Sequence, residues 1–358
     1  MNVHELPLVA FTILAQMSVG SFVVLGVVHL FGIRKHGHGA VDRLSDPALY
    51  AIGPAMVLGL IASIFHLGNP VNALNAINHL GSSWLSREIF FGSAFACMGA
   101  VFAVVQWRRW LTPLLRQILA GATALVGLVL VYSMSMVYML PTVPAWNHWA
   151  TPVTFFTTTF LLGALAVGAA LVIVYTYRQR TTATAGSTDA AATEAGTVTG
   201  AETGTVTGTE TAATEASTEA SGGVDVATAV VVEADDETRA STNALLRSSL
   251  RMIAAASIVL LGIEFVVLPT YALDLATGNA NAQASAATLM TAGGAVLLTR
   301  LILVFLGAGL LGFFLYRSAA RGHQRHLVYL ATSAFVLVFA SETIGRMLFY
   351  SSFDRIGL

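Results

Sequence analysis

The stretch LVAFTILAQMSVGSFVVLGVVHLF, residues 8–31, contains no charged side chain and is long enough to form a membrane-spanning helix. The hydrocarbon core of a bilayer is about 30 Å thick, and a helix needs about 20 apolar residues to cross it. Further runs of that kind follow along the chain at about 48–66, 87–107, 113–140, 153–176, 246–268, 293–316 and 327–350. The sequence therefore predicts an all-α membrane protein, a bundle of eight transmembrane helices.

The composition agrees with the membrane class. Hydrophobic residues make up 56% of the chain and charged residues only 10%, whereas soluble proteins carry about 25% charged residues. The single cysteine, Cys97, excludes an intrachain disulfide, a zinc ribbon and an iron–sulfur cluster held by cysteines of this chain. Because no basic region or small-residue cleavage site precedes the first run, we expect it to be a retained helix.

The basic residues predict the orientation, since cytoplasmic loops of membrane proteins are enriched in Lys and Arg. With strict alternation of the eight runs, fourteen of the eighteen basic residues fall on one side. The other four are Arg87, Arg300, Arg346 and Arg355. We therefore expect both termini to be extracytoplasmic, together with the three longer outer connections at 67–86, 141–152 and 269–292.

Residues 181–243 differ from the rest of the sequence. They are rich in Thr, Ala and Gly and contain eleven acidic residues but one basic residue, Arg239. Such a segment buries too little apolar surface to offset the entropy lost on ordering. The sequence predicts a disordered acidic cytoplasmic linker here. It separates residues 1–180, with helices 1–5, from residues 244–358, with helices 6–8.

Ionisable residues inside membrane spans are costly and by default indicate function. The candidates are Glu88, Glu264, Arg300, Glu342, Arg346 and, at a helix end, His66. The predicted orientation places all of them in the outer third of the membrane. This shared depth favours one functional region near the outer face.

Structural explanations for these charges remain open. Glu342 and Arg346 are spaced i, i+4 and can neutralise each other on one helix. Glu264 and Arg300 lie at similar depths and can pair between helices. Glu88 falls in the first turn of its helix, where an acid suits the helix dipole and Ser86 can cap.

His66 lies in the stretch FHLGNP, residues 65–70. A histidine before a Gly-Asn-Pro turn can bond local backbone, or it can take a proton at the membrane edge, since its unperturbed pKa is about 6.5. A histidine and a glutamate at one level of an apolar pocket suit the oxidation of a hydroquinone. That reaction releases two protons and two electrons, and it needs bases near the ring hydroxyls.

Other cofactors are disfavoured by the sequence. A b-type haem needs axial histidines deep in the bundle, whereas all nine histidines lie in loops or at helix ends. We therefore expect no haem and no metal site. No phosphate-binding loop, dinucleotide fingerprint or zinc-protease motif occurs in usable context, and no nucleic-acid partner is expected.

Four segments carry a family resemblance. They are HELPLVAFT from His4, SIFHLGNPVNALNAINHLGSSWLSREIF from Ser63, TVPAWNHWATPVTFF from Thr142 and SETIGRMLFY from Ser341. In these segments the protein resembles the membrane-anchor (C) subunit family of anaerobic dimethyl sulfoxide reductase. The resemblance covers most of helices 1–5 and helix 8, is weaker through helices 6 and 7, and finds no counterpart for the linker.

The resemblance implies an eight-helix, haem-free anchor in the cell (cytoplasmic) membrane. Such an anchor oxidises menaquinol near the outer face without holding the catalytic centre. It implies electron transfer to an iron–sulfur subunit and a molybdopterin catalytic subunit, docked on the extracytoplasmic side. By motif, His66 and Glu88 match the positions that bind and oxidise quinol. Arg87 varies in the pattern but belongs to the same expected site, and Glu342 and Arg346 are expected to shape or tune the pocket.

Three alternatives stay open. The protein can be a passive structural anchor without a quinol site, or a polysulfide-reductase-type quinone-reactive anchor with a different partner. A proton or ion transporter would require ionisable residues at mid-depth or in the inner half, where the sequence has almost none.

Overall fold

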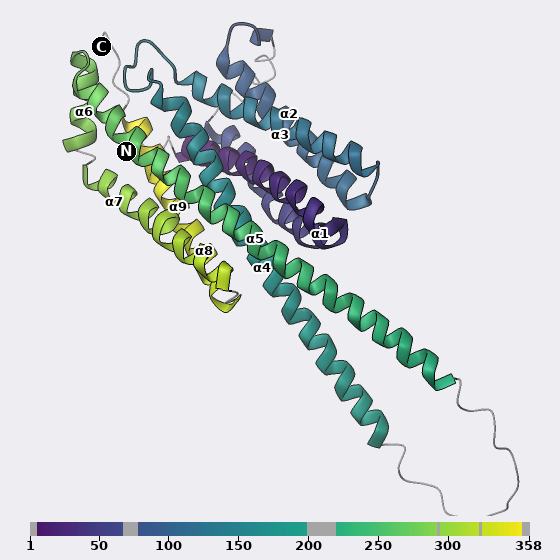
Figure 1. The fold of residues 1–358 in the computed structure, drawn as a ribbon. Helices are drawn as coiled ribbons and strands as arrows, with labels where there is room; N and C mark the ends of the chain where they lie inside the picture. The colour runs from purple at the N-terminus through teal and green to yellow at the C-terminus, as the bar shows by residue number, and fades with distance from the viewer. Residues whose placement is uncertain (1–5, 67–77, 199–219, 292–293, 322–323, 353–358) are drawn as a thin grey trace, which may run out of the picture.

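The computed structural model describes residues 6–66, 78–198, 220–291, 294–321 and 324–352, and every regular element in these ranges is helical. The longer elements are α1 (Leu6–His66), α2 (Trp84–Arg108), α3 (Pro113–Val137), α4 (Ala150–Val198), α5 (Ala220–Ala276), α6 (Ala280–Thr291), α7 (Gly294–Val304), the π-helix η3 (Phe305–Leu311), α8 (Gly312–Arg321) and α9 (Gln324–Ser351). Figure 1 shows them as one elongated bundle.

Seven helical stretches in the described ranges are long and apolar enough to cross a membrane. They are Leu6–Gly37, Trp84–Arg108, Pro113–Val137, Ala150–Thr181, Arg239–Ala276, Gly294–Arg321 and His326–Ser351. The protein is thus a multi-pass, all-helical membrane protein, as expected. The remaining predicted span, 48–66, falls in the second half of α1, where several side chains lie outside the described residues.

Helix α1 is a hairpin of two arms that meet at Gly37. Gly37 has φ 74° and ψ 168°, a conformation that a residue without a Cβ adopts readily. On either side of it, Gly32 faces Val41, and further away Gly59 faces Leu14. The second arm therefore runs back antiparallel along the first, so the expected loop between the first two spans is reduced to a sharp kink.

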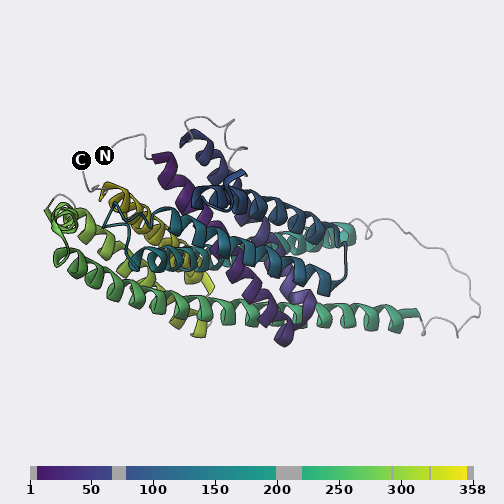
Figure 2. The ribbon, with the colours of Figure 1, turned by 90° about the horizontal axis from the view of Figure 1, so that it is seen from above.

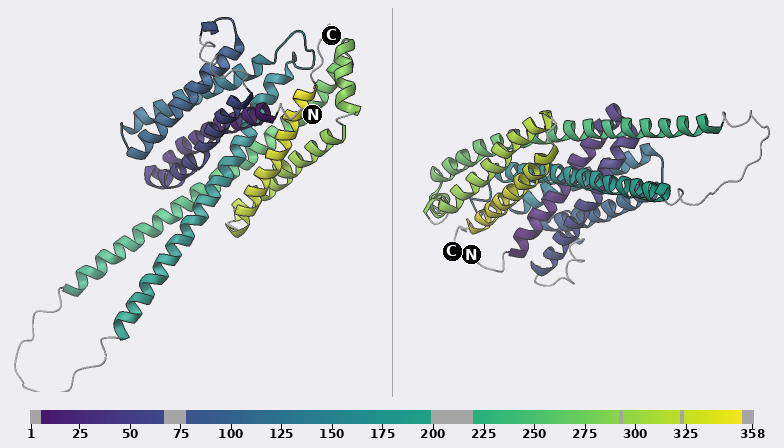
Figure 3. Two further views of the ribbon diagram at one scale, coloured as in Figure 1. Left: turned by 180° about the vertical axis from the view of Figure 1, so that it is seen from behind. Right: turned by 90° about the horizontal axis from the view of Figure 1, so that it is seen from below.

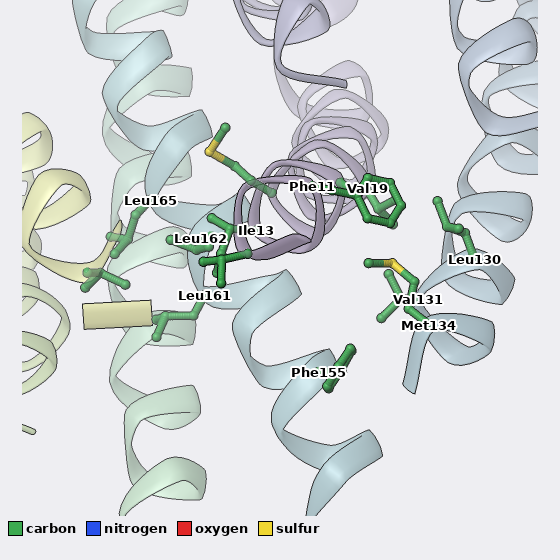
Figure 4. Packing of buried hydrophobic residues seen from close by; sticks show 14 of the residues in the cluster. Phe11, Ile13, Val19, Leu130, Val131, Met134, Phe155, Leu161, Leu162 and Leu165 are labelled. Carbon is green, nitrogen blue, oxygen red and sulfur yellow. The ribbon is translucent and has the colours of Figure 1, made fainter. Parts of the chain in front are cut away.

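The core is formed where α1, α3 and α4 pack together (Figure 4). The labelled residues include Phe11 and Val19 of α1, Leu130 of α3, and Phe155 and Leu161 of α4. All are buried. The arrangement is typical of membrane bundles, in which dispersion between well-fitted side chains replaces the hydrophobic effect.

The closest approach in this core is between two glycines. A Cβ added at Gly20 of α1 would overlap the carbonyl oxygen of Thr159, and one added at Gly163 of α4 would overlap the backbone of Gly20. Small residues at a crossing point let two backbones come together inside a bilayer. This pair therefore determines how closely α1 and α4 can pack.

Helix α5 continues past Pro269 to Ala276, whereas the sequence pattern ends this helix at 268. A proline inside a helix removes one backbone donor. The carbonyl that loses its partner is that of Phe265, and the hydroxyl of Thr270 donates to the next two carbonyls, those of Val266 and Val267, both at 2.9 Å. The helix therefore runs across Pro269, with the hydroxyl of the next residue bonded to the backbone of the preceding turn.

Both ends of the predicted linker are helical in the structure. Helix α4 extends to Val198 and α5 starts at Ala220, and the two form arms that project beyond the bundle (Figures 1 and 2). Extending an existing helix needs no new nucleation, and alanine has the highest helix propensity. These two facts account for helix where composition alone favoured disorder; residues 199–219 lie outside the description.

A charged cluster lies at the end of the bundle opposite α6. Helix α1 begins and α9 ends at the end that carries α6 (Figures 1 and 3). At the opposite end, where α2 turns into α3, Arg109 bonds Asp42 at 2.5 Å and Asp46 at 2.6 Å. Burial raises the pKa of the Asp46 carboxyl, and the neighbouring Gln106 and Arg109 oppose that rise. This cluster ties the second arm of α1 to α2.

Candidate functional site

Glu88 lies one turn inside α2. The helix begins at Trp84, and the side chain of Ser83 accepts a hydrogen bond from the backbone N–H of Ser86 at 3.3 Å. The capping residue is thus Ser83 and not Ser86, so that prediction was wrong by three residues. Because the cap lies a turn earlier, the carboxyl group of Glu88 is not needed at the helix terminus.

The carboxyl group of Glu88 is buried, and no cation among the described residues pairs with it. The residue is 5% exposed, and no residue in the described ranges gives it a hydrogen bond or an ion pair. The groups that interact with it electrostatically are the hydroxyls of Tyr138 and Tyr350. A buried charge is expensive unless it is paired. This is the arrangement of a group that can take up and release a proton.

The two tyrosines join α9 to the end of α3. Their hydroxyl oxygens are 3.0 Å apart, and the hydroxyl of Tyr350 also donates to Thr12 of α1 at 3.5 Å. Tyr138 packs edge-on against Trp146 and Phe349, each at 5.4 Å between ring centroids. These rings hold the hydroxyl pair in a fixed position.

A second polar cluster links α5, α7 and α9. Arg300 forms an ion pair with Glu264, which confirms the interhelical pair expected from their equal depth. Glu342 lies 3.6 Å from the same guanidinium and accepts a hydrogen bond from Thr158 at 2.7 Å. One arginine therefore serves two buried carboxylates from different helices.

Arg346 does not form the expected i, i+4 ion pair with Glu342 as its main contact. Its guanidinium donates to Gln16 of α1 at 2.9 Å and lies over the ring of Phe155, 3.8 Å from the centroid. Because Glu342 is held by Arg300 and Thr158, each member of the pair bonds a different helix. The explanation that the two only neutralise each other on α9 is wrong.

Gly345 makes the position of Arg300 possible. A Cβ added at this glycine would overlap the guanidinium of Arg300, and the hydroxyl of Ser341 donates to the Arg300 carbonyl at 2.9 Å. The sequence SETIG, residues 341–345, thus supplies the serine, the carboxylate and the gap that receive α7.

Replacing Arg300 with Gln is expected to destabilise the protein by about 3–5 kcal/mol, because it leaves Glu264 and Glu342 facing each other without a cation. The triple variant Arg300→Gln, Glu264→Gln, Glu342→Gln should lose less stability than the single variant, because no buried charge is left without its partner. Thermal unfolding of the detergent-solubilised protein measures both. Equal melting temperatures for the single and triple variants would contradict this account.

The cluster opens onto a cavity of about 540 Å³ between α4, α5, α6, α7 and α9. Arg300, Glu342 and Arg346 line it, and Glu88 does not. The expected site residues therefore occupy two neighbouring places. Glu342 and Arg346 line the cavity, whereas Glu88 lies in α2 and outside its lining.

The two other residues expected in the site are Arg87 and His66, and only the side chain of Arg87 is described. Arg87 donates to the carbonyls of Leu80 at 2.8 Å and Gly81 at 2.9 Å, and its guanidinium stacks on Trp84. It therefore holds the turn that precedes α2. His66 is the last residue of α1, and its side chain lies outside the described residues.

Several residues of the site escaped the sequence analysis, namely Tyr138, Tyr350, Thr12, Gln16 and Thr158. Gln16 and Thr158 are buried polar residues within apolar runs, which is a usable signal. The tyrosines carried none, because aromatic residues near the ends of membrane helices are common.

The sequence matches one protein family and several known proteins. A family model described as DMSO reductase anchor subunit (DmsC) matches residues 1–352. Over 164 residues the sequence is 36% identical to the C chain of anaerobic dimethyl sulfoxide reductase from Escherichia coli K12, which covers 45% of this protein and 56% of that one. Over 172 residues it is 34% identical to the corresponding protein of Haemophilus influenzae, covering 48% and 60%.

A more distant relative is the C component of sulfite dehydrogenase from Allochromatium vinosum, 27% identical over 179 residues, covering 46% of this protein and 52% of that one. The matches thus span little more than half the length of the curated relatives.

Proposed function

Because this chain belongs to the DMSO reductase anchor subunit (DmsC) family, we propose that it is the quinol-oxidising membrane anchor of a dimethyl sulfoxide reductase-type molybdoenzyme. The quinol is menaquinol. The electrons leave to an iron–sulfur partner subunit that serves a molybdopterin catalytic subunit. The anchor itself holds neither of these centres.

The proposal includes a topology. The second arm of α1 supplies the eighth span, both termini are extracytoplasmic, and the partners dock at the end of the bundle that carries α6. The basic residues of the alternate connections support this orientation, since they gather at the opposite, cytoplasmic end. The membrane is the cytoplasmic membrane of the cell.

Glu88 carries the functional assignment. It is a buried carboxyl group inside a membrane helix, it has no cation in the described part of the protein, and it interacts electrostatically with the hydroxyls of Tyr138 and Tyr350. A structural carboxylate at that depth requires a paired cation, as Glu264 has in Arg300. A general base for a hydroxyl substrate requires the opposite, a free acceptor.

In the proposed reaction, menaquinol enters laterally from the lipid. The two ring hydroxyls lose two protons, one to Glu88 and one to His66, and the two electrons pass to the iron–sulfur subunit. The hydroxyls of Tyr138 and Tyr350 orient the ring and hold Glu88 in place. Glu88 and His66 then release both protons to water on the extracytoplasmic side, the same side as the site. The step therefore moves no charge across the membrane.

The test uses lipid nanodiscs that contain or lack this anchor, to which the purified partner subunits are added. A reduced menaquinone analogue should reduce the iron–sulfur centres rapidly only when the anchor is present, whereas a water-soluble dye should reduce them in both cases. Electron paramagnetic resonance of the reduced centres gives the rates. Equal quinol-driven rates with and without the anchor would make it a passive tether.

A further inference from the structure

The cavity between α5, α6, α7 and α9 is separate from the place where Glu88 lies. Phe349, which packs edge-on against Tyr138, lines the cavity, whereas Glu88 and the two tyrosines do not. Its volume of about 540 Å³ falls within the usual range for small-molecule sites, about 300–1,000 Å³. The function proposed above makes no use of this space.

The cavity has an apolar wall that meets the lipid. Leu268, Pro269 and Ala272 of α5 and Leu297 of α7 contribute to it. Phe265 and Met290 also line it, and their outer surfaces are 41% and 61% exposed. Phe265 belongs to the membrane-spanning stretch Arg239–Ala276, so in a bilayer its exposed face meets acyl chains and an amphiphile can enter there from the lipid.

The other wall carries hydrogen-bonding groups that are buried. Arg300, Glu342 and Arg346 all line the cavity and are all more than nine-tenths buried. Within the described residues, Arg300 Nε, Arg346 Nε and Glu342 Oε1 have no hydrogen-bond partner. Buried polar atoms are nearly always bonded, so unpaired polar groups on three side chains that line one cavity favour a polar ligand there.

The charges select the kind of headgroup. The two guanidinium groups of Arg300 and Arg346 are balanced by the carboxylates of Glu264 and Glu342. A cluster without net charge disfavours an anionic lipid phosphate, which requires an excess of cations. A neutral quinol fits this lining, because each ring hydroxyl can accept a hydrogen bond from a guanidinium group and donate one to the carboxylate; a quinone carbonyl can accept from the guanidinium groups alone.

We propose that this cavity is a second quinone site, one that holds a quinone or quinol headgroup between α5, α7 and α9 while Glu88 serves the reacting molecule. The headgroup lies against Arg300, Glu342 and Arg346, and its isoprenoid tail leaves past Phe265 and Met290. The inference rests on the proposed function only for the identity of the ligand as a quinone.

The experiment uses the full-length protein in lipid nanodiscs and an azido-naphthoquinone probe, with labelled peptides mapped by mass spectrometry. Labels are expected in 265–301 and 342–352, and separately near Glu88. Ala272→Phe, which fills the cavity from a half-buried position, should reduce the first set about tenfold, equivalent to about 1.4 kcal/mol. Leu273→Phe is the matched control, since Leu273 is 63% exposed and does not line the cavity.

Gly345→Ala is the second variant, because the added methyl displaces Arg300 without touching the apolar wall. It should weaken labelling of the same peptides and leave the Glu88 region labelled. Equal labelling in the wild type and Ala272→Phe, or labels that phospholipid but not menaquinone displaces, would overturn the second site. Glu88→Gln separates the two ideas: if it keeps quinol-driven turnover while the cavity is still labelled, the proposed reaction fails and the second site stands.

Discussion

Glu88→Gln is expected to lower the quinol-dependent rate of the assembled complex by about 10²–10⁴-fold, the usual contribution of a positioned general base. Glutamine keeps the size and hydrogen-bonding ability of the side chain but cannot take the proton from the quinol hydroxyl. Since the carboxyl group has no cation partner in the described residues, its loss strands no buried charge. Stopped-flow reduction of the iron–sulfur partner by a menaquinol analogue measures the rate.

Two controls accompany this variant. Asp274→Asn removes an acid at the same end of the bundle that pairs with His148 at 3.0 Å and is half exposed, and it should leave the rate within about twofold. Dye-driven turnover of the Glu88→Gln complex should equal that of the wild type, which shows that the partners are assembled. A normal quinol-dependent rate in Glu88→Gln would remove Glu88 from the reaction.

Gly163→Ala is expected to have the largest effect on the fold. The added methyl would overlap the backbone of Gly20, and no side chain can move aside to relieve a contact between two backbones. Overpacking of a core typically costs about 1–3 kcal/mol and sometimes more, and we expect at least about 3 kcal/mol here. Helices α1 and α4 must then separate, and they form the most extensive helix pair in the bundle.

The control is Gly26→Ala in the same α1 helix, where an added Cβ meets nothing within 4 Å. Exchange of a helical glycine for alanine stabilises by about 0.5–1 kcal/mol, so this variant should melt slightly higher than the wild type. The yield of monodisperse protein and the thermal midpoint in detergent measure both. If Gly163→Ala and Gly26→Ala behave alike, the close crossing of α1 and α4 is not what holds them together.

The span pattern and the Glu264–Arg300 pair could be predicted from the sequence, because both depend on depth along a helix. Each helix is defined by a continuous apolar run, and two charges at equal depth on neighbouring helices have few other partners. The kink at Gly37 was harder to foresee, since a positive φ at a single glycine replaces a whole loop.

What could not be predicted depends on which helices are neighbours. Tyr138 and Tyr350 are separated by 212 positions, and their hydroxyls meet because α9 packs beside the end of α3. The contacts of Glu342 and Arg346 were expected along one helix but form across three, to Thr158, Arg300 and Gln16. The spacing of residues in the sequence indicates contacts along one helix. It carries no information on contacts between different helices.

The projecting arms of α4 and α5 have a practical consequence. The two helices are already anchored within the bundle, with Gly168 against Ile253 and with Leu171 and Leu250 in a common core, well before the arms begin. A fluorescent protein or an affinity tag inserted between residues 199 and 219 is therefore carried at the far end of two helical spacers. The protein offers a built-in attachment point for labelling the intact complex, remote from both the buried carboxyl groups and the lateral opening.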